Sequence, residues 1–291
     1  SFDQAVVPSV SGLELCIGRV DLYAMPHFYT DSGLNETALV ANYLNKDHDF
    51  RCREGYFQTE VQRRVLLASW AGGPFKLTST QKAGFEAVFG QTAVHEYDNL
   101  SMHWFAGTPG VSGGHASVED YLVGYGGGFG APPANYASGV GWTYVDEPSP
   151  PPEKPANNFV GVDSRVVFMN LYGSFFGSWD QPDDFLRAPL ANPYDPTTGR
   201  HGYGLAAIYG RTEGLDETSL TKRVLGACIG EAIFKGYRGD LHFALMGDPT
   251  LRMHTVAPPT RPLPPAPLAV AGSTVSLVWI PSPDTVSGYN I

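Results

Sequence analysis

The sequence predicts an α/β fold with a mainly parallel sheet flanked by helices, followed by part of a β-sandwich. Short apolar runs recur along the first 255 residues, and many of them end in glycine. Helical patterns lie between several of these runs, which is the alternation typical of a parallel sheet. After a proline-rich segment the pattern changes to the two-residue alternation of β-hairpins.

The expected strands are apolar runs that break at glycine or at a polar residue. The runs at 121–130 and 166–180 are apolar enough to be buried on both faces. Parallel strands often end in this way below an active-site crevice. Further strands are expected within 13–20, 63–73, 93–98, 205–210 and 242–248.

Three segments carry helical patterns. Asn35 is a suitable N-cap for a helix over the following residues, and Gly90 is a suitable end for a helix that begins near Thr78. The clearest pattern runs from Thr218 to Lys235, where apolar residues form one stripe.

Proline-rich segments divide the chain. Residues 129–160 form a long excursion between two core strands, and residues 256–267 (VAPPTRPLPPAP) form a stiff linker. We therefore expect an α/β domain over 1–255 and the beginning of a β-sandwich over 268–291.

Composition excludes several classes of partner. The net charge is −10, and no cluster of Lys and Arg offers a surface for a phosphate backbone, so we expect no nucleic acid. No apolar stretch reaches 18 residues, so we expect no membrane span. The three cysteines and eight histidines show no spacing that we interpret as a zinc site.

The last segment resembles the start of a fibronectin type III domain. The run VSLVWIPSPDTVSGYNI at 275–291 is similar to that family's second strand, its tryptophan and the turn into the next strand. Only the first third of such a domain is present.

The larger region resembles the gingipain-type cysteine peptidases, which are caspase-like α/β proteins. The resemblance is carried by CIGRVDL at 16–22, by the two strand ends at 121–130 and 166–180, and by ALMGDPTLRM at 244–253. It looks closest to large multidomain proteins of a planctomycete-like or verrucomicrobia-like branch. It implies a secreted or cell-surface bacterial protein.

Both catalytic positions of that family are replaced in this chain. Active members carry a histidine after one strand and a cysteine after the next, so that an imidazole activates a thiolate. Residue by residue, Tyr125 stands at the histidine position and Leu171 at the cysteine position. We interpret both residues as exposed tips of their strands, and we expect no catalytic residue there.

The resemblance therefore implies a catalytically inert domain that acts in binding or extracellular assembly. Its partner would be a protein, a glycan or a further copy of the chain. The alternative is a hydrolase with a non-standard nucleophile, for which Ser174 and Cys52 are the candidates. The expected binding crevice is lined by Tyr125, Gly126, Phe129, Asn170, Tyr172, Gly173 and Trp179. An equal alternative is that the aromatic residues of this region pack a loop onto the sheet.

No cofactor is expected, with calcium as the one alternative. Asp180, Asp183 and Asp184 form a group of carboxylates that suits a hard cation. The competing interpretation is that these acids cap the helix predicted directly after them.

Overall fold

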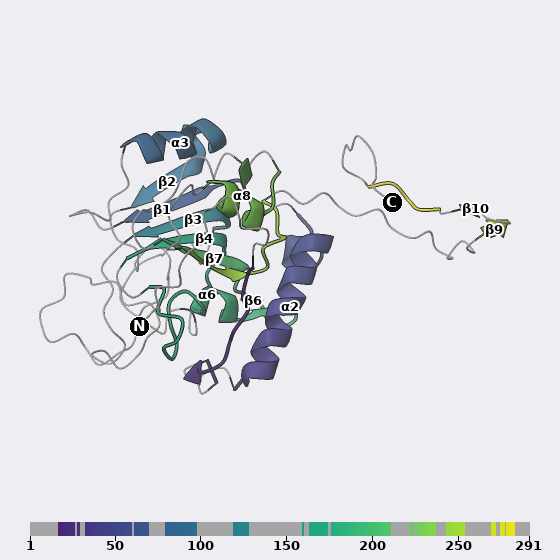
Figure 1. Ribbon diagram of the computed structural model, residues 1–291, viewed down its shortest axis with the longest axis horizontal. Helices are drawn as coiled ribbons and strands as arrows, with labels where there is room; N and C mark the ends of the chain where they lie inside the picture. Colours follow the sequence, from purple (N-terminus) through teal and green to yellow (C-terminus); the bar gives the residue numbers. More distant parts are fainter. Residues whose placement is uncertain are drawn as a thin grey trace, which may run out of the picture.

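A six-stranded sheet forms the centre of the protein in the computed structural model (Figure 1). The structure describes residues 17–26, 28–29, 33–59, 61–69, 79–97, 119–127, 159, 163–173, 176–210, 222–223, 226–236, 243–253, 269–271, 274–276 and 278–282. The strand order is β2-β1-β3-β4-β7-β8. These strands are β1 (Val65–Ser69), β2 (Val94–Tyr97), β3 (Tyr121–Gly127), β4 (Val166–Tyr172), β7 (Ala206–Gly210) and β8 (Phe243–Gly247).

The first five of these strands are parallel, and β8 alone is antiparallel to its neighbour. The predicted α/β class with a mainly parallel sheet is confirmed, and it is compatible with a caspase-like fold. Every residue of β3 is buried, as are the first six of β4, which agrees with the continuous apolar runs of the sequence. Outside this sheet, β5 (Tyr194–Asp195) and β6 (Arg200–His201) form a small antiparallel pair.

Helix α2 (Glu36–Cys52) packs against the sheet. Its N-cap is Asn35, as predicted, because the Asn35 side chain accepts a hydrogen bond from the backbone N–H of Ala38 at 2.9 Å. Near its other end the ring of Phe50 meets the edge of Phe168 on β4, with 5.7 Å between the ring centroids. Further helices in the described part of the chain include α3 (Ser79–Phe89), which ends before Gly90 as predicted, α6 (Ala188–Ala191) and α8 (Ile229–Gly236).

The helix expected over 218–235 is interrupted, so that prediction was wrong. Gly226 has a φ of 93°, and its N–H donates to Arg223 O, while the N–H of Ala227 donates to Lys222 O. This is the hydrogen-bonding pattern that ends a helix at a left-handed glycine. Helix α8 therefore begins only at Ile229. The predicted apolar stripe joined residues from before and after this helix end as if they belonged to one helix.

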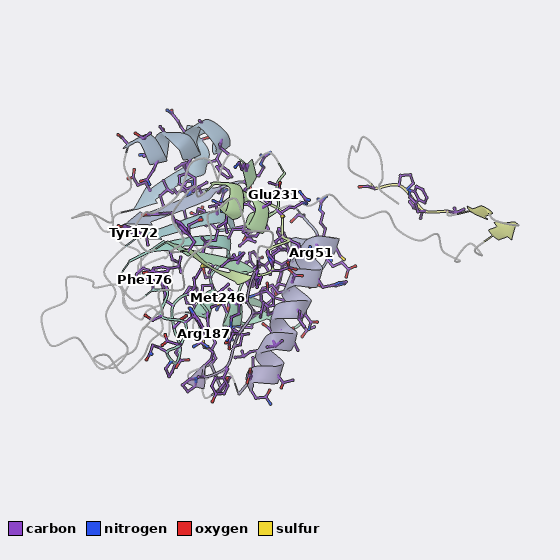
Figure 2. All side chains as sticks on the ribbon, viewed as in Figure 1. Arg51, Tyr172, Phe176, Arg187, Glu231 and Met246 are labelled. Carbon is purple, nitrogen blue, oxygen red and sulfur yellow. The ribbon has the colours of Figure 1, made fainter. Side chains whose placement is uncertain are left out.

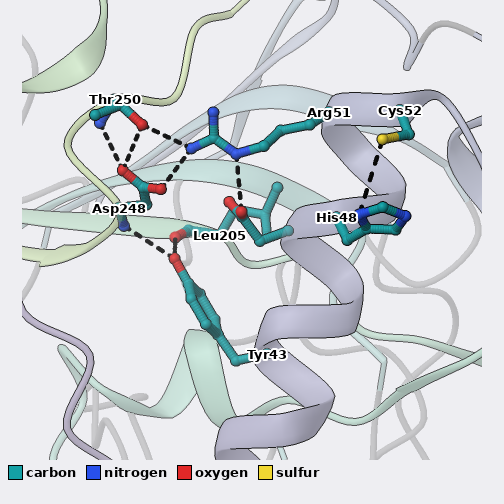
Figure 3. A network of polar contacts seen from close by, with 8 residues as sticks. Tyr43, His48, Arg51, Cys52, Leu205, Asp248 and Thr250 are labelled. Atoms are coloured by element: carbon teal, nitrogen blue, oxygen red, sulfur yellow. Dashed lines mark hydrogen bonds and ion pairs between the residues drawn. The ribbon is translucent and has the colours of Figure 1, made fainter. Parts of the chain in front are cut away.

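The motif Gly247-Asp248-Pro249-Thr250 ties the end of β8 to α2 (Figure 3). The carboxylate of Asp248 accepts from the Thr250 N–H at 2.7 Å, which is the local bond that the sequence predicts. The same carboxylate accepts from Arg51 of α2 at 2.5 Å, and the hydroxyl of Tyr43 accepts from the Asp248 N–H at 2.9 Å. The motif has a structural role in docking α2.

The C-terminal part contains an antiparallel hairpin, β9 (Ala269–Ala271) and β10 (Thr274–Ser276). The hairpin agrees with the alternation of the sequence, and the fibronectin-like assignment stays a prediction. The linker 256–267 lies outside the described residues. Within the part of the chain that the structure describes, no helix combines the length and apolar composition needed to cross a bilayer.

Candidate functional site

The carboxyl ends of the parallel strands meet at one edge of the sheet, where the sequence places the candidate crevice. Tyr125 pairs in register with Asn170, and Gly126 pairs with Leu171. Residues in register on adjacent parallel strands share a face, and successive residues alternate between faces. Tyr125 and Asn170 therefore share one face, here called the Asn170 face, and Leu171 belongs to the opposite face.

The two positions that stand for the peptidase dyad do not face each other. Tyr125 and Leu171 lie on opposite faces of the sheet, and each is only 2% exposed. The interpretation of these residues as exposed strand tips was wrong, because the sheet is covered on both faces at this level. The described carboxyl ends of β3, β4 and β7 contain no cysteine, serine or histidine.

A buried polar cluster occupies the Asn170 face instead. The Asn170 side chain is 4% exposed and donates to Gly124 O at 3.2 Å. Its carbonyl oxygen accepts from the guanidinium of Arg223 at 3.3 Å, and Arg223 is fully buried. Asn170 thus joins β3, β4 and the segment before α8, so its described contacts are structural.

Arg223 was missed by the sequence analysis. It lies in the interval that was read as a continuous helix with a single apolar stripe, where a lone arginine falls on the solvent side. Its partner Asn170 is 53 residues away in the sequence. A polar residue inside the apolar run of β4 was the available signal, because a buried amide requires a hydrogen-bonding partner.

The other residues predicted to line the crevice differ from one another in exposure. Gly126 and Gly173 are buried, whereas Tyr172 and Trp179 are partly exposed. The guanidinium of Arg19 lies over the ring of Trp179, 4.3 Å from its centroid. Phe129 and Ser174 lie outside the described residues.

The acidic group after β4 shows contacts of a capping kind. Asp184 accepts from the backbone N–H of Arg187 at 2.8 Å, just before α6, and its carboxylate lies 3.7 Å from the Arg187 guanidinium. Burial raises the pKa of Asp184 to about 7, although the charge of Arg187 acts in the opposite direction. Asp183 is buried and its N–H donates to Ala24 O, while Asp180 is exposed. Asp184 thus stabilises the turn before α6, whose N-cap Arg187 has no side-chain capping bond. The calcium interpretation stays a prediction.

A second polar cluster, made of potential metal ligands, lies at the C-terminal end of α2, away from the carboxyl ends of β3 and β4. In the view of Figure 2, Tyr172 at the end of β4 lies at one end of the strands, and Arg51 near the end of α2 lies beyond their other end. His48, Cys52 and Glu54 form the one group in the described part of the chain where three metal-ligating atoms lie within 4.8 Å of one another. From the sequence we interpret no His/Cys spacing as a zinc site. His48 and Cys52 are nevertheless four residues apart on α2 and so share a face of the helix.

Burial raises the pKa of the Cys52 thiol, and the nearby carboxylates of Glu54 and Asp49 raise it further. A thiol in such a setting is a poor nucleophile, because only its thiolate reacts readily.

Comparisons of the chain with protein-family models, with curated proteins and with solved structures found no match.

Proposed function

We propose that this chain is a catalytically inert gingipain-like domain of a secreted or cell-surface bacterial protein, acting in binding or extracellular assembly. The proposal rests on the identity, burial and placement of the residues at the two positions where active members of that family carry histidine and cysteine. Tyr125 and Leu171 are buried and lie on opposite faces of the sheet. A phenol and an alkyl group in these positions cannot supply the activated thiolate that this class of peptidase requires.

The contacts around these positions support a structural role for the strand ends. Asn170 uses both ends of its amide within the protein, one toward Gly124 and one toward Arg223. A group that is already satisfied and nearly inaccessible has little to offer a substrate. Recognition would instead use two partly exposed aromatic residues, Tyr172 at the end of β4 and Trp179 after it, since rigid aromatic side chains are favoured at binding surfaces.

The second candidate is a hydrolase with a non-standard nucleophile. It is favoured by one contact, in which Cys52 Sγ lies 3.8 Å from His48 Nδ1. The raised pKa of Cys52 and its place at the C-terminal end of a helix both oppose it, because that end of a helix disfavours a thiolate.

Hydrolysis of casein and of a mixed peptide library by the purified chain tests the proposal. We expect no release of peptides above the blank. Hydrolysis that disappears in Ser174→Ala or in Cys52→Ser, and persists in Cys228→Ser, would establish the second candidate and contradict the first.

A further inference from the structure

The C-terminal end of α2 presents three side chains of different chemistry to one point. His48 and Cys52 come from the last turns of the helix, and Glu54 comes from the residue after the C-cap. Cys52 Sγ lies 3.8 Å from His48 Nδ1, and His48 Nε2 lies 3.8 Å from Glu54 Oε2. Figure 3 shows the sulfur of Cys52 directed at the imidazole of His48.

The backbone holds this arrangement in place. Arg53 adopts a left-handed conformation with a φ of 56°, which turns the chain back on itself. The N–H of Glu54 then donates to Asp49 O at 2.8 Å. The turn is the reason that Glu54 returns to the helix face that carries His48.

The electrostatic setting favours a cation at this point. The C-terminal end of a helix carries partial negative charge, and the carboxylate of Glu54 adds to it. The charge of Arg51 is engaged elsewhere, because its guanidinium binds Asp47 at 2.8 Å and Asp248 at 2.5 Å. In Figure 3 these bonds of Arg51 point away from the pair formed by His48 and Cys52.

We propose that His48, Cys52 and Glu54 bind a thiophilic divalent metal ion of the zinc class, with water in a fourth position. Zinc takes thiolate, imidazole and carboxylate ligands at about 2.0–2.3 Å in a tetrahedron, which places neighbouring ligand atoms about 3.3–3.8 Å apart. One ligand atom from each residue lies within 4.8 Å of the other two. The 3.8 Å contacts to Cys52 and to Glu54 use different nitrogens of His48, so only one of them is a ligand pair before the side chains adjust. Calcium and magnesium are excluded by the same ligand set, because hard cations prefer oxygen.

Binding requires only small adjustments. One imidazole nitrogen coordinates the ion, so either the ring of His48 or the carboxylate of Glu54 rotates. The side chains of His48 and Glu54 are 64% and 62% exposed, so both are free to do so. The thiol of Cys52 releases its proton to solvent as the sulfur–metal bond forms.

The ion would fasten the end of α2 to the short helix η2 (Gly55–Phe57) that follows. Phe57 is buried there, with its ring 5.3 Å from that of Phe50 and 5.6 Å from that of Tyr194. A ligand that binds only the folded state stabilises that state by mass action. Occupancy of the site is therefore expected to stabilise the fold, and the inference goes beyond the proposed binding function without depending on it.

Titration of the metal-free chain with Co²⁺ tests the site. Cobalt occupies zinc sites, and its bond to a thiolate gives a charge-transfer absorption band that oxygen and nitrogen ligands do not give. We expect this band to saturate at one ion per chain and to be absent in Cys52→Ser. Since loss of a supporting residue alone weakens metal affinity roughly 10- to 100-fold, His48→Gln and Glu54→Gln should each weaken binding at least tenfold.

Cys228→Ser is the matched control, because Cys228 is the other described free cysteine and is likewise partly exposed. It should bind cobalt as the wild type does. Absence of the band with cobalt in excess, its survival in Cys52→Ser, or its loss in Cys228→Ser would each overturn the proposal. If Cys52→Ser does not fold, the melting temperature with Zn²⁺ decides. It should rise further in the wild type than in Glu54→Gln, and an equal rise in both would overturn the site.

Discussion

The carboxyl edge of the sheet and the C-terminal end of α2 differ in how their polar groups are used. At the edge, Asn170 and Arg223 are buried and bond to each other, and Asn170 also donates to the backbone of β3. At the helix end, His48 and Glu54 are mostly exposed, and His48 approaches both Glu54 and Cys52 at 3.8 Å. In the described part of the chain, the ends of β3 and β4 are thus occupied by structural contacts, whereas the three side chains proposed as metal ligands lie at the end of α2.

The helix end itself contains two kinds of polar group. Arg51, one residue before Cys52, takes part in a network with Asp248 and Thr250 that holds β8 against α2. The three potential metal ligands are not used in that network. Substitutions in each region, with the free energy of unfolding as the measurement, separate the groups that stabilise the fold from the groups that are available to a ligand.

The largest expected effect is that of Gly247→Ala, which distorts the turn below the Arg51 network. Gly247 has a φ of 115°, and an added Cβ would lie 2.3 Å from the backbone oxygen of Leu205. The strained backbone and the overpacking together should cost roughly 2–6 kcal/mol. Urea denaturation measures this loss. Gly199→Ala is the matched control, because Gly199 has a φ of 82° with no atom within 4 Å of its added Cβ, so it carries the backbone cost alone.

The next effect is a pH dependence of stability at Asp184, a buried acid in the segment after β4. Burial raises its folded pKa to about 7, above the value of 3.8 for an exposed aspartate. The folded state therefore binds the proton more tightly than the unfolded state does. This tighter proton binding stabilises the folded state, and the stabilisation is fully present below the unfolded pKa of Asp184. It is lost as the pH rises through the folded pKa, by roughly 1.4 kcal/mol per pH unit between the two values.

Asp184→Asn isolates this contribution, because asparagine retains an acceptor for the Arg187 N–H and does not titrate. The free energy of unfolding of the variant should exceed that of the wild type increasingly between about pH 4 and about pH 7. A constant difference between the two proteins across this range would show that Asp184 keeps an ordinary pKa.

The smallest effect concerns the polar cluster at the edge of the sheet. Asn170→Leu removes the acceptor used by Arg223 and the donor to Gly124 O, and should cost about 1.5–3 kcal/mol. Asn170→Asp keeps an acceptor for Arg223 and should lose less. Equal losses in the two variants, measured by urea denaturation, would show that the bond to Arg223 contributes nothing.

Much of the fold could be predicted because its elements carry local signals. The continuous apolar runs at 121–127 and 166–172 lie in the centre of the sheet, and Asn35 caps α2 through a bond within its own helix. The break at Gly226 was missed because an apolar stripe does not reveal where a glycine turns left-handed. The pairing of Arg223 with Asn170 is a contact between distant segments, which no local pattern encodes.

The candidate site was predicted less well, for a physical reason. An apolar strand that ends in glycines indicates the edge of a sheet, but not whether the side chains there are exposed. Alternation places Tyr125 and Leu171 on opposite faces, yet that follows only from the register between β3 and β4. The spacing of His48 and Cys52 was visible in the sequence, whereas the return of Glu54 depends on the left-handed turn at Arg53.

The most direct test of the central claim is labelling of the intact chain with electrophilic probes for nucleophilic serines and cysteines, followed by mass-spectrometric mapping. The account predicts no adduct on the segments that end β3 and β4, Ser174 included, with adducts only on cysteines that a general alkylating agent also modifies. A stoichiometric adduct on Ser174, abolished by prior denaturation, would contradict the account and place an active nucleophile at the edge of the sheet.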